Sequence, residues 1–235
     1  MSDAKTPLVL LPGLLCDDAL WAPEIAALAD IAVARVGDPT QHDSMAGMAE
    51  AVLNTAPEQF ALAGLSMGGY VAFEIMRRAP ERVLRLALLD TSARPDTPQQ
   101  TKQRHELMAL ARKGDFKGVT PRLLPRWVHP SRVTDRALAD TVMAMTQRVG
   151  REAFLRQQMA IMNRADSRPT LPQIECPTLV LCGHEDQSTP VELHREMAAD
   201  IANARLVVVP ECGHLSTLER PGIVSRELRT WLTGD

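Results

Sequence analysis

The stretch QFALAGLSMGGYVA, residues 59–72, constrains the fold more than any other part of the sequence. An apolar run ends at Ser66, which has Gly64 and Gly68 two positions to either side, and a helical pattern follows at once. A strand that turns directly into a helix strains the residue at its apex and pushes that side chain out above the sheet. We expect the turn to bring positions 64 and 68 together, so that only glycine fits at either of them.

Short apolar runs that end in glycine, proline or aspartate recur along the chain. They lie at residues 8–13, 31–38, 60–66, 83–90, 178–183 and 205–210. Each run is continuous rather than alternating, as in strands that are buried on both faces of a parallel sheet. Stretches with helical spacing separate the runs. The alternation predicts an α/β fold with a mostly parallel central sheet of about six strands and helices on both faces.

Residues 94–170 interrupt this alternation, because they carry helical patterns and no strand pattern. The helical segments are QRHELMALARKG, TDRALADTVMAMTQRVG and REAFLRQQMAIMNRA. We expect a helical cap over the carboxyl ends of the strands, where ligands bind in open α/β sheets. Additional core packing is the alternative interpretation. The predicted division is a core of residues 1–93 and 171–235 and a cap insertion of residues 94–170.

Composition and charge narrow the class of partner. The chain has 235 residues, of which 45% are hydrophobic, and a formal net charge of −3, so nothing favours nucleic acid or a membrane surface as partner. The apolar segment PLVLLPGLL is too short to span a bilayer and lacks the pattern of a signal peptide. We therefore expect a cytoplasmic protein with reduced cysteines. Two short pairs, Cys182 with His184 and Cys212 with His214, are a weak metal motif, and we expect no metal or other cofactor.

Ser66 lies in a G-x-S-x-G motif between a predicted strand and a predicted helix, which is the context of a nucleophile elbow. Backbone N–H groups and the positive end of the helix point toward such a residue, so the N–H of Met67 is a candidate donor to an oxyanion. A glycine-rich phosphate turn is the alternative. The segment has neither G-x-G-x-x-G nor G-x-x-x-x-G-K-[ST], and we favour the nucleophile.

A serine nucleophile needs a base, and the base needs an orienting acid. His214 follows the last predicted strand in the loop VVVPECGHLSTLE, and we prefer it to the other histidines, with His184 as second choice. Asp186 follows the penultimate strand and is the preferred acid, with Asp90 as the alternative. The resulting chain order of Ser66, Asp186 and His214 is that of one known triad topology.

The motifs LLPG, GLSMGG, CGHEDQSTP and CGHL, in this order, resemble those of the α/β-hydrolase fold superfamily. More narrowly, the sequence is similar to the bacterial branch that includes 3-oxoadipate enol-lactone hydrolases and small carboxylesterases. The resemblance implies a serine esterase or lactonase that cleaves a small ester through an acyl-enzyme on Ser66. It also implies an oxyanion hole made by the backbone N–H groups of Met67 and Leu14. Relatives usually have histidine where this chain has Pro12.

These motifs do not identify the substrate. The predicted pocket includes Leu15, Arg126 and Trp127, although solvated surface is the alternative for Arg126. We expect a small-molecule ester or lactone, while thioester cleavage, C–C bond hydrolysis, perhydrolysis and receptor-like ligand binding are alternatives on the same three residues. Cys16 and Cys212 lie close in sequence to the proposed catalytic elements, so we expect thiol reagents to block the pocket. The oligomeric state is left open.

Overall fold

A computed structural model describes residues 5–114 and 116–234. Within these residues, six strands form one sheet in the order β2-β1-β3-β4-β5-β6, and every neighbouring pair is parallel. The predicted α/β class with a parallel sheet is confirmed. The strands are β1 (Thr6–Leu11), β2 (Ala32–Val36), β3 (Phe60–Leu65), β4 (Val83–Leu89), β5 (Thr178–Gly183) and β6 (Ala204–Val209).

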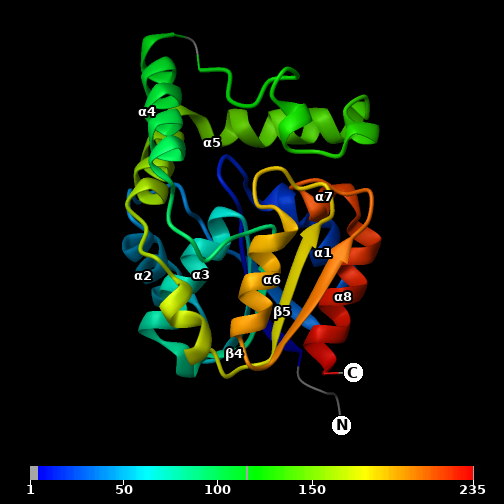
Figure 1. The fold of residues 1–235 in the computed structure, drawn as a ribbon. Coiled ribbons are helices and arrows are strands. Elements are labelled where there is room, and N and C mark those ends of the chain that lie inside the picture. The colour runs from blue at the N-terminus through cyan, green and yellow to red at the C-terminus, as the bar shows by residue number, and fades with distance from the viewer. Residues whose placement is uncertain (1–4, 115, 235) are drawn as a thin grey trace.

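Helices cover both faces of the sheet (Figure 1). Successive strand residues point to opposite faces, so Leu8 and Leu10 of β1 lie in one apolar cluster while Val9 and Leu11 lie in the other. The first cluster packs under α1 (Ala22–Ala27) and α8 (Pro221–Thr233), and the second under α2 (Met45–Thr55), α3 (Met67–Arg78) and α6 (Val191–Asp200). The short helices are η1 (Asp18–Trp21), η2 (Pro80–Arg82), η3 (Leu124–Arg126), η4 (Pro130–Arg132), η5 (Arg168–Gln173) and α7 (Ser216–Glu219).

The strand order reverses direction between β1 and β3. The chain runs from β1 outward to β2, then returns to form β3 on the other side of β1. Ligands of open α/β sheets bind at such a reversal, beyond the carboxyl ends of the strands. The loop after β1 and the turn after β3 meet there, because a Cβ added to Gly13 would lie 3.4 Å from the Cβ of Ser66.

Two long helices, α4 (Pro98–Lys113) and α5 (Arg136–Met162), lie above the arrowheads of the strands in Figure 1. The second and third helical segments predicted in this interval are joined in α5, which breaks at Gly150 with φ 75°. Ala93 O accepts the Ser167 N–H at 2.8 Å, so the two ends of the interval lie side by side. We propose on this basis that residues 94–170 form the cap. No helix in the described part of the chain has the length and apolar character to cross a membrane.

Candidate active site

Ser66 stands at the junction of β3 and α3 with φ 54° and ψ −114°. Such a conformation costs about 1–3 kcal/mol and persists only where the surroundings impose it. A Cβ on Gly64 would overlap the backbone of Gly68, and a Cβ on Gly68 would overlap the carbonyl of Leu11. The predicted crowding at both glycines is confirmed. The N–H of Ser66 donates to Leu89 O at 2.9 Å, which ties the turn to the neighbouring strand.

His214 connects Ser66 to Asp186. Its Nε2 lies 2.9 Å from Ser66 Oγ, and its Nδ1 lies 2.7 Å from Asp186 Oδ2. Asp186 also accepts the backbone N–H of Ser188 at 2.8 Å, and from Thr189 both the N–H at 3.0 Å and the hydroxyl at 2.6 Å. The structure therefore brings the three residues predicted from the sequence together within hydrogen-bonding distance, as proton transfer from serine to histidine requires.

Burial and charge have opposite effects on the pKa values of His214 and Asp186. Burial lowers the pKa of His214, but the charge of Asp186 and the hydrogen bond to it outweigh burial, so the pKa lies above its usual 6.5. Burial raises the pKa of Asp186, but the charge of His214 and the hydrogen bonds that Asp186 accepts hold it below its usual 3.8. Asp186 is thus suited to stabilise a protonated imidazole.

A buried glutamate that the sequence analysis did not single out holds the loop of His214. The Glu219 carboxylate accepts the N–H of Gly213 at 3.1 Å and the N–H of Leu215 at 3.2 Å, one on each side of His214. Glu219 is 1% exposed. In the linear sequence it looks like any acidic residue of a short polar helix, and only the folded loop directs two backbone donors at it.

The cap holds the same loop from the other side. Trp127 O accepts the N–H of His214 at 2.8 Å, and the N–H of His129 donates to Glu219 Oε2 at 2.7 Å. The Trp127 ring stands edge-on to the imidazole, with the two ring centres 6.2 Å apart and an interplanar angle of 86°. The orientation of His214 therefore depends on the cap as well as the core.

The alternative base and acid lie elsewhere. His184 is exposed, and its Nδ1 lies 2.9 Å from Glu185 Oε1 at the surface. Asp90 is buried and accepts the N–H of Gly183 at 3.0 Å and of Ser216 at 3.2 Å. Burial and the nearby charge of Asp186 raise the pKa of Asp90 to about 8. Asp90 thus fastens two strand-end loops, whereas Asp186 faces the imidazole.

The loop after β1 is a tight turn in which the Cys16 N–H donates to Gly13 O at 3.1 Å. Leu15 has φ 60°, and its N–H donates to Gln157 Oε1 at 3.1 Å from the cap helix α5. Gln157 is fully buried and was not singled out from the sequence. It fixes the peptide orientation next to Leu14, which lines the cavity above Ser66. The oxyanion roles of the Leu14 and Met67 N–H groups stay predictions.

A cavity of about 270 Å³ lies over Ser66 and His214. Trp127 forms part of its wall, as the sequence suggested. Arg126 lies outside it with an exposed side chain, because the adjacent Trp127 takes the inward-facing position at the end of η3, so the alternative of solvated surface holds for Arg126. The remaining lining residues are Leu14, Tyr70, Ser92, Arg94, Pro95, Asp96, Thr97, Gln100, Arg104, Ile161, Arg164, Ser188, Thr189 and Leu193.

A second cavity, of about 210 Å³, shares Leu14 and Trp127 with the first. Leu15 lines this second cavity and not the one over Ser66. Its walls are mostly apolar and come largely from the cap: Leu107, Leu110, Ala111, Phe116, Lys117, Gly118, Val119, Leu123, Phe154 and Gln158.

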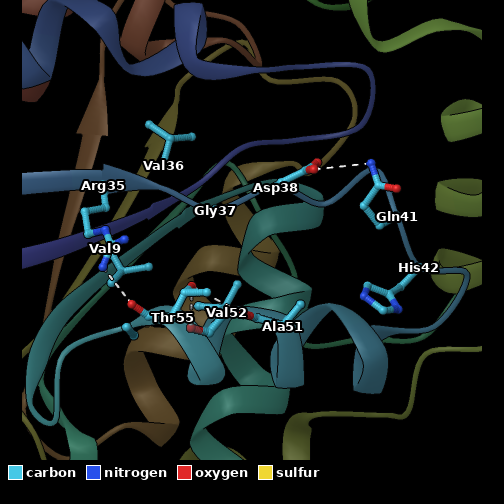
Figure 2. A pocket seen from close by; sticks show the side chains of 11 residues that line it. Val9, Arg35, Val36, Gly37, Asp38, Gln41, His42, Ala51, Val52 and Thr55 are labelled. Carbon is cyan, nitrogen blue, oxygen red and sulfur yellow. Dashed lines mark hydrogen bonds between the residues drawn. The ribbon is translucent and has the colours of Figure 1, made fainter.

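A larger cavity, of about 330 Å³, lies beside the edge strand β2, away from Ser66 and His214 (Figure 2). Several of its polar groups are bonded to one another or to backbone: Gln41 donates to Asp38 Oδ2 at 3.4 Å, and Arg35 donates to Thr55 O at 2.7 Å. His42 is among its lining residues, which include no serine. Size therefore does not select the candidate site, whereas the hydrogen-bonded chain at Ser66 does.

The two cysteines correct an expectation from the sequence. Cys16 and Cys212 are both buried, and burial raises the pKa of each thiol, that of Cys16 to about 12 with a further contribution from the charge of Asp17. Because the thiolate is the reactive form, the structure does not support the expected sensitivity to thiol reagents.

His194 lies in a helical stretch among charged residues and was not singled out as a site residue from the sequence. It is fully buried in α6, and its Nε2 accepts the N–H of Thr91 at 2.9 Å. The Thr91 hydroxyl in turn donates to Ser66 O at 2.8 Å. Burial lowers the pKa of His194 to about 4, which suits a neutral ring that accepts a hydrogen bond. Through Thr91, His194 thus supports the turn that carries Ser66.

Known proteins with the same fold include several hydrolases. The chain is 30% identical over 187 residues to the pimeloyl-[acyl-carrier protein] methyl ester esterase of Nitrosomonas europaea, covering 76% of this chain and 73% of that one. It is similar in structure to an esterase from Thermogutta terrifontis solved with malate bound, with a TM-score of 0.89, 29% identity, and 98% and 90% of the two chains covered. The enol-lactonase from Burkholderia xenovorans LB400 gives a TM-score of 0.88 at 25% identity, with 98% and 92% covered.

The predicted resemblance to enol-lactonases and small esterases is confirmed by these relatives. A sequence profile of the alpha/beta hydrolase family matches residues 8–227, which is most of the chain. The geometry at Ser66, the parallel sheet and this match agree with one another. The protein belongs to the alpha/beta hydrolase family.

Proposed function

We propose that this protein is a serine hydrolase that cleaves a short carboxylic ester or lactone through an acyl-enzyme on Ser66. The observation that carries the proposal is the continuous hydrogen-bonded chain from Ser66 through His214 to Asp186, beneath a cavity of about 270 Å³. The ester and lactone bonds named for the relatives support the choice of bond. A cavity of this size favours a short acyl group.

The mechanism has two steps. Ser66 Oγ attacks the carbonyl carbon while His214 Nε2 accepts its proton, and the backbone N–H groups of Met67 and Leu14 bind the developing oxyanion. His214 then gives the proton to the leaving alcohol. Water attacks the acyl-enzyme with His214 as base, and the acid is released as Ser66 takes the proton back. Asp186 holds the imidazole in the tautomer with hydrogen on Nδ1 throughout.

The test is hydrolysis of p-nitrophenyl esters of increasing acyl length, together with simple lactones. Ser66→Ala is compared with Ser225→Ala, a serine of α8 that takes no part in the site. We expect Ser66→Ala to lower kcat by about 10⁴-fold or more, and Ser225→Ala to match the wild type. Intact-mass spectrometry of the wild type during turnover is expected to show one added acyl group. Equal activity of Ser66→Ala and wild type on every substrate would refute the proposal.

A further inference from the structure

Two arginines and one aspartate form a compact cluster in the wall of the cavity over Ser66. Arg104 Nε lies 2.6 Å from Asp96 Oδ2, and Arg164 Nη1 lies 2.6 Å from Asp96 Oδ1. The Asp96 side chain is 1% exposed, that of Arg164 is 7% exposed and that of Arg104 is 20% exposed. All three residues line the same cavity as Ser66 and His214.

The charges of this cluster do not cancel. One carboxylate is shared by two guanidinium groups, which leaves one positive charge in excess. The third arginine of the cavity, Arg94, is already matched, because it makes two bonds of 2.9 Å with Glu196. Apart from His214, the other lining residues are neutral. A largely buried charge without a counterion is costly, so this wall favours an anion over a neutral group.

The guanidinium groups are held in place. Arg164 donates to Arg94 O at 2.9 Å and to Ile161 O at 2.8 Å, and it lies 4.2 Å from the centre of the Tyr70 ring. Arg104 donates to Gln158 Oε1 at 2.9 Å. Within the described residues, the bonds of Arg104 to Asp96 and Gln158 use three of its five N–H donors. A rigid group with donors to spare suits bidentate recognition of a carboxylate.

We propose that the Arg104–Asp96–Arg164 cluster binds a carboxylate of the substrate, so that the preferred substrates are short monoesters of dicarboxylic acids. This inference rests on the proposed function of Ser66. A single negative charge balances the cluster, and a cavity of about 270 Å³ accommodates a chain of a few carbons between the ester and the acid. Asp96 and Arg104 come from the start of the cap, and Arg164 follows α5. None of the three was among the pocket residues predicted from the sequence.

The experiment compares monomethyl and dimethyl esters of succinic, glutaric and adipic acid, which share a scissile bond and differ in charge. We expect the wild type to prefer the monoester of one of these acids by about tenfold or more in kcat/KM. Arg104→Gln and Arg164→Gln should each lower kcat/KM for that monoester by about 10- to 100-fold, mainly through KM. Their losses on the diester should be at least tenfold smaller. Arg126→Gln, an exposed arginine outside the cavity, is the matched control and should keep the wild-type preference.

Equal rates on monoester and diester in the wild type would overturn the inference. Equal losses on the two esters in both arginine variants would overturn it as well, since the cluster would then serve only to fasten the cap. Calorimetry of monomethyl glutarate with Ser66→Ala measures binding without turnover. If this variant binds the monoester but the wild type does not hydrolyse it, the Ser66 mechanism fails while the carboxylate site stands.

If the arginine variants do not fold, Asp96→Asn keeps both guanidinium groups and adds one net positive charge. Combined with Ser66→Ala, it should bind the monoester more tightly than Ser66→Ala alone. Unchanged or weaker binding in the folded double variant would count against the cluster.

Discussion

Two regions of the core bury glutamates completely, with opposite consequences. Glu219, at the carboxyl ends of the strands, is 1% exposed and accepts backbone N–H groups from both sides of His214. Glu24, in α1 on one face of the sheet, is 0% exposed, and within the described residues neither of its carboxylate oxygens has a hydrogen-bond partner. Burial accordingly raises the pKa of Glu24 to about 9.

Burial of an acid therefore identifies neither a charge nor a functional site. At the strand ends, loops direct N–H donors toward Asp186 and Glu219. In α1 the helix uses its own backbone groups, so Glu24 stays neutral in the folded protein.

Asp186→Asn should have the largest effect. The amide retains the shape but removes the charge that stabilises protonated His214 and selects its tautomer, so kcat should fall by about 10³–10⁴-fold. Ester hydrolysis and the denaturant midpoint are measured together. A loss of less than tenfold in a folded variant would show that Asp90 or another acid can orient His214.

Glu219→Gln should destabilise the protein by about 1–3 kcal/mol, since an amide nitrogen that cannot accept a hydrogen bond replaces one of the two oxygens that accept the three N–H groups. Activity should fall as well, because the bonds on both sides of His214 loosen. Urea unfolding and kcat/KM are the measurements. Unchanged stability and activity would mean that Trp127 O alone is sufficient to hold the loop.

Glu24→Gln should act in the opposite direction and stabilise the protein by about 1–3 kcal/mol at pH 7. The folded pKa of about 9 lies above the ordinary 4.5, so the contribution of Glu24 to stability is fully present below pH 4.5 and is lost as pH rises toward 9. The gain from glutamine should therefore be small at pH 5 and large at pH 8. A gain that is equal at both values, or a destabilisation at pH 8, would refute a neutral Glu24.

The pH dependence of activity gives the smallest effect. Since Asp186 raises the pKa of His214 against the effect of burial, the acid limb of kcat/KM should have its midpoint above 6.5. Activity falls below that midpoint because the base is already protonated. In Asp186→Asn the midpoint should move to lower pH. A midpoint below 6.5 in the wild type would mean that burial outweighs the charge of Asp186.

Local pattern was enough to predict the fold and the central residues of the candidate site. Continuous apolar runs predicted the parallel strands. The glycines around Ser66 indicated a turn in which neither glycine position has room for a Cβ. His214 and Asp186 follow strands whose carboxyl ends meet at one edge, so their proximity follows from topology. Arg126 was misplaced because sequence does not tell which of two adjacent residues at a helix end faces inward.

The alternation of strand and helix, the strained turn at Ser66 and the order of the candidate residues follow from sequence alone, because they depend on neighbours along the chain. How those residues are held depends on the folded structure. Gln157 and His194 accept the N–H groups of Leu15 and Thr91, which lie far from them in the sequence. The cluster of Arg104, Asp96 and Arg164 likewise joins the two ends of the cap. Such contacts leave no periodic pattern in the sequence, since each depends on where separate elements of the chain meet in space.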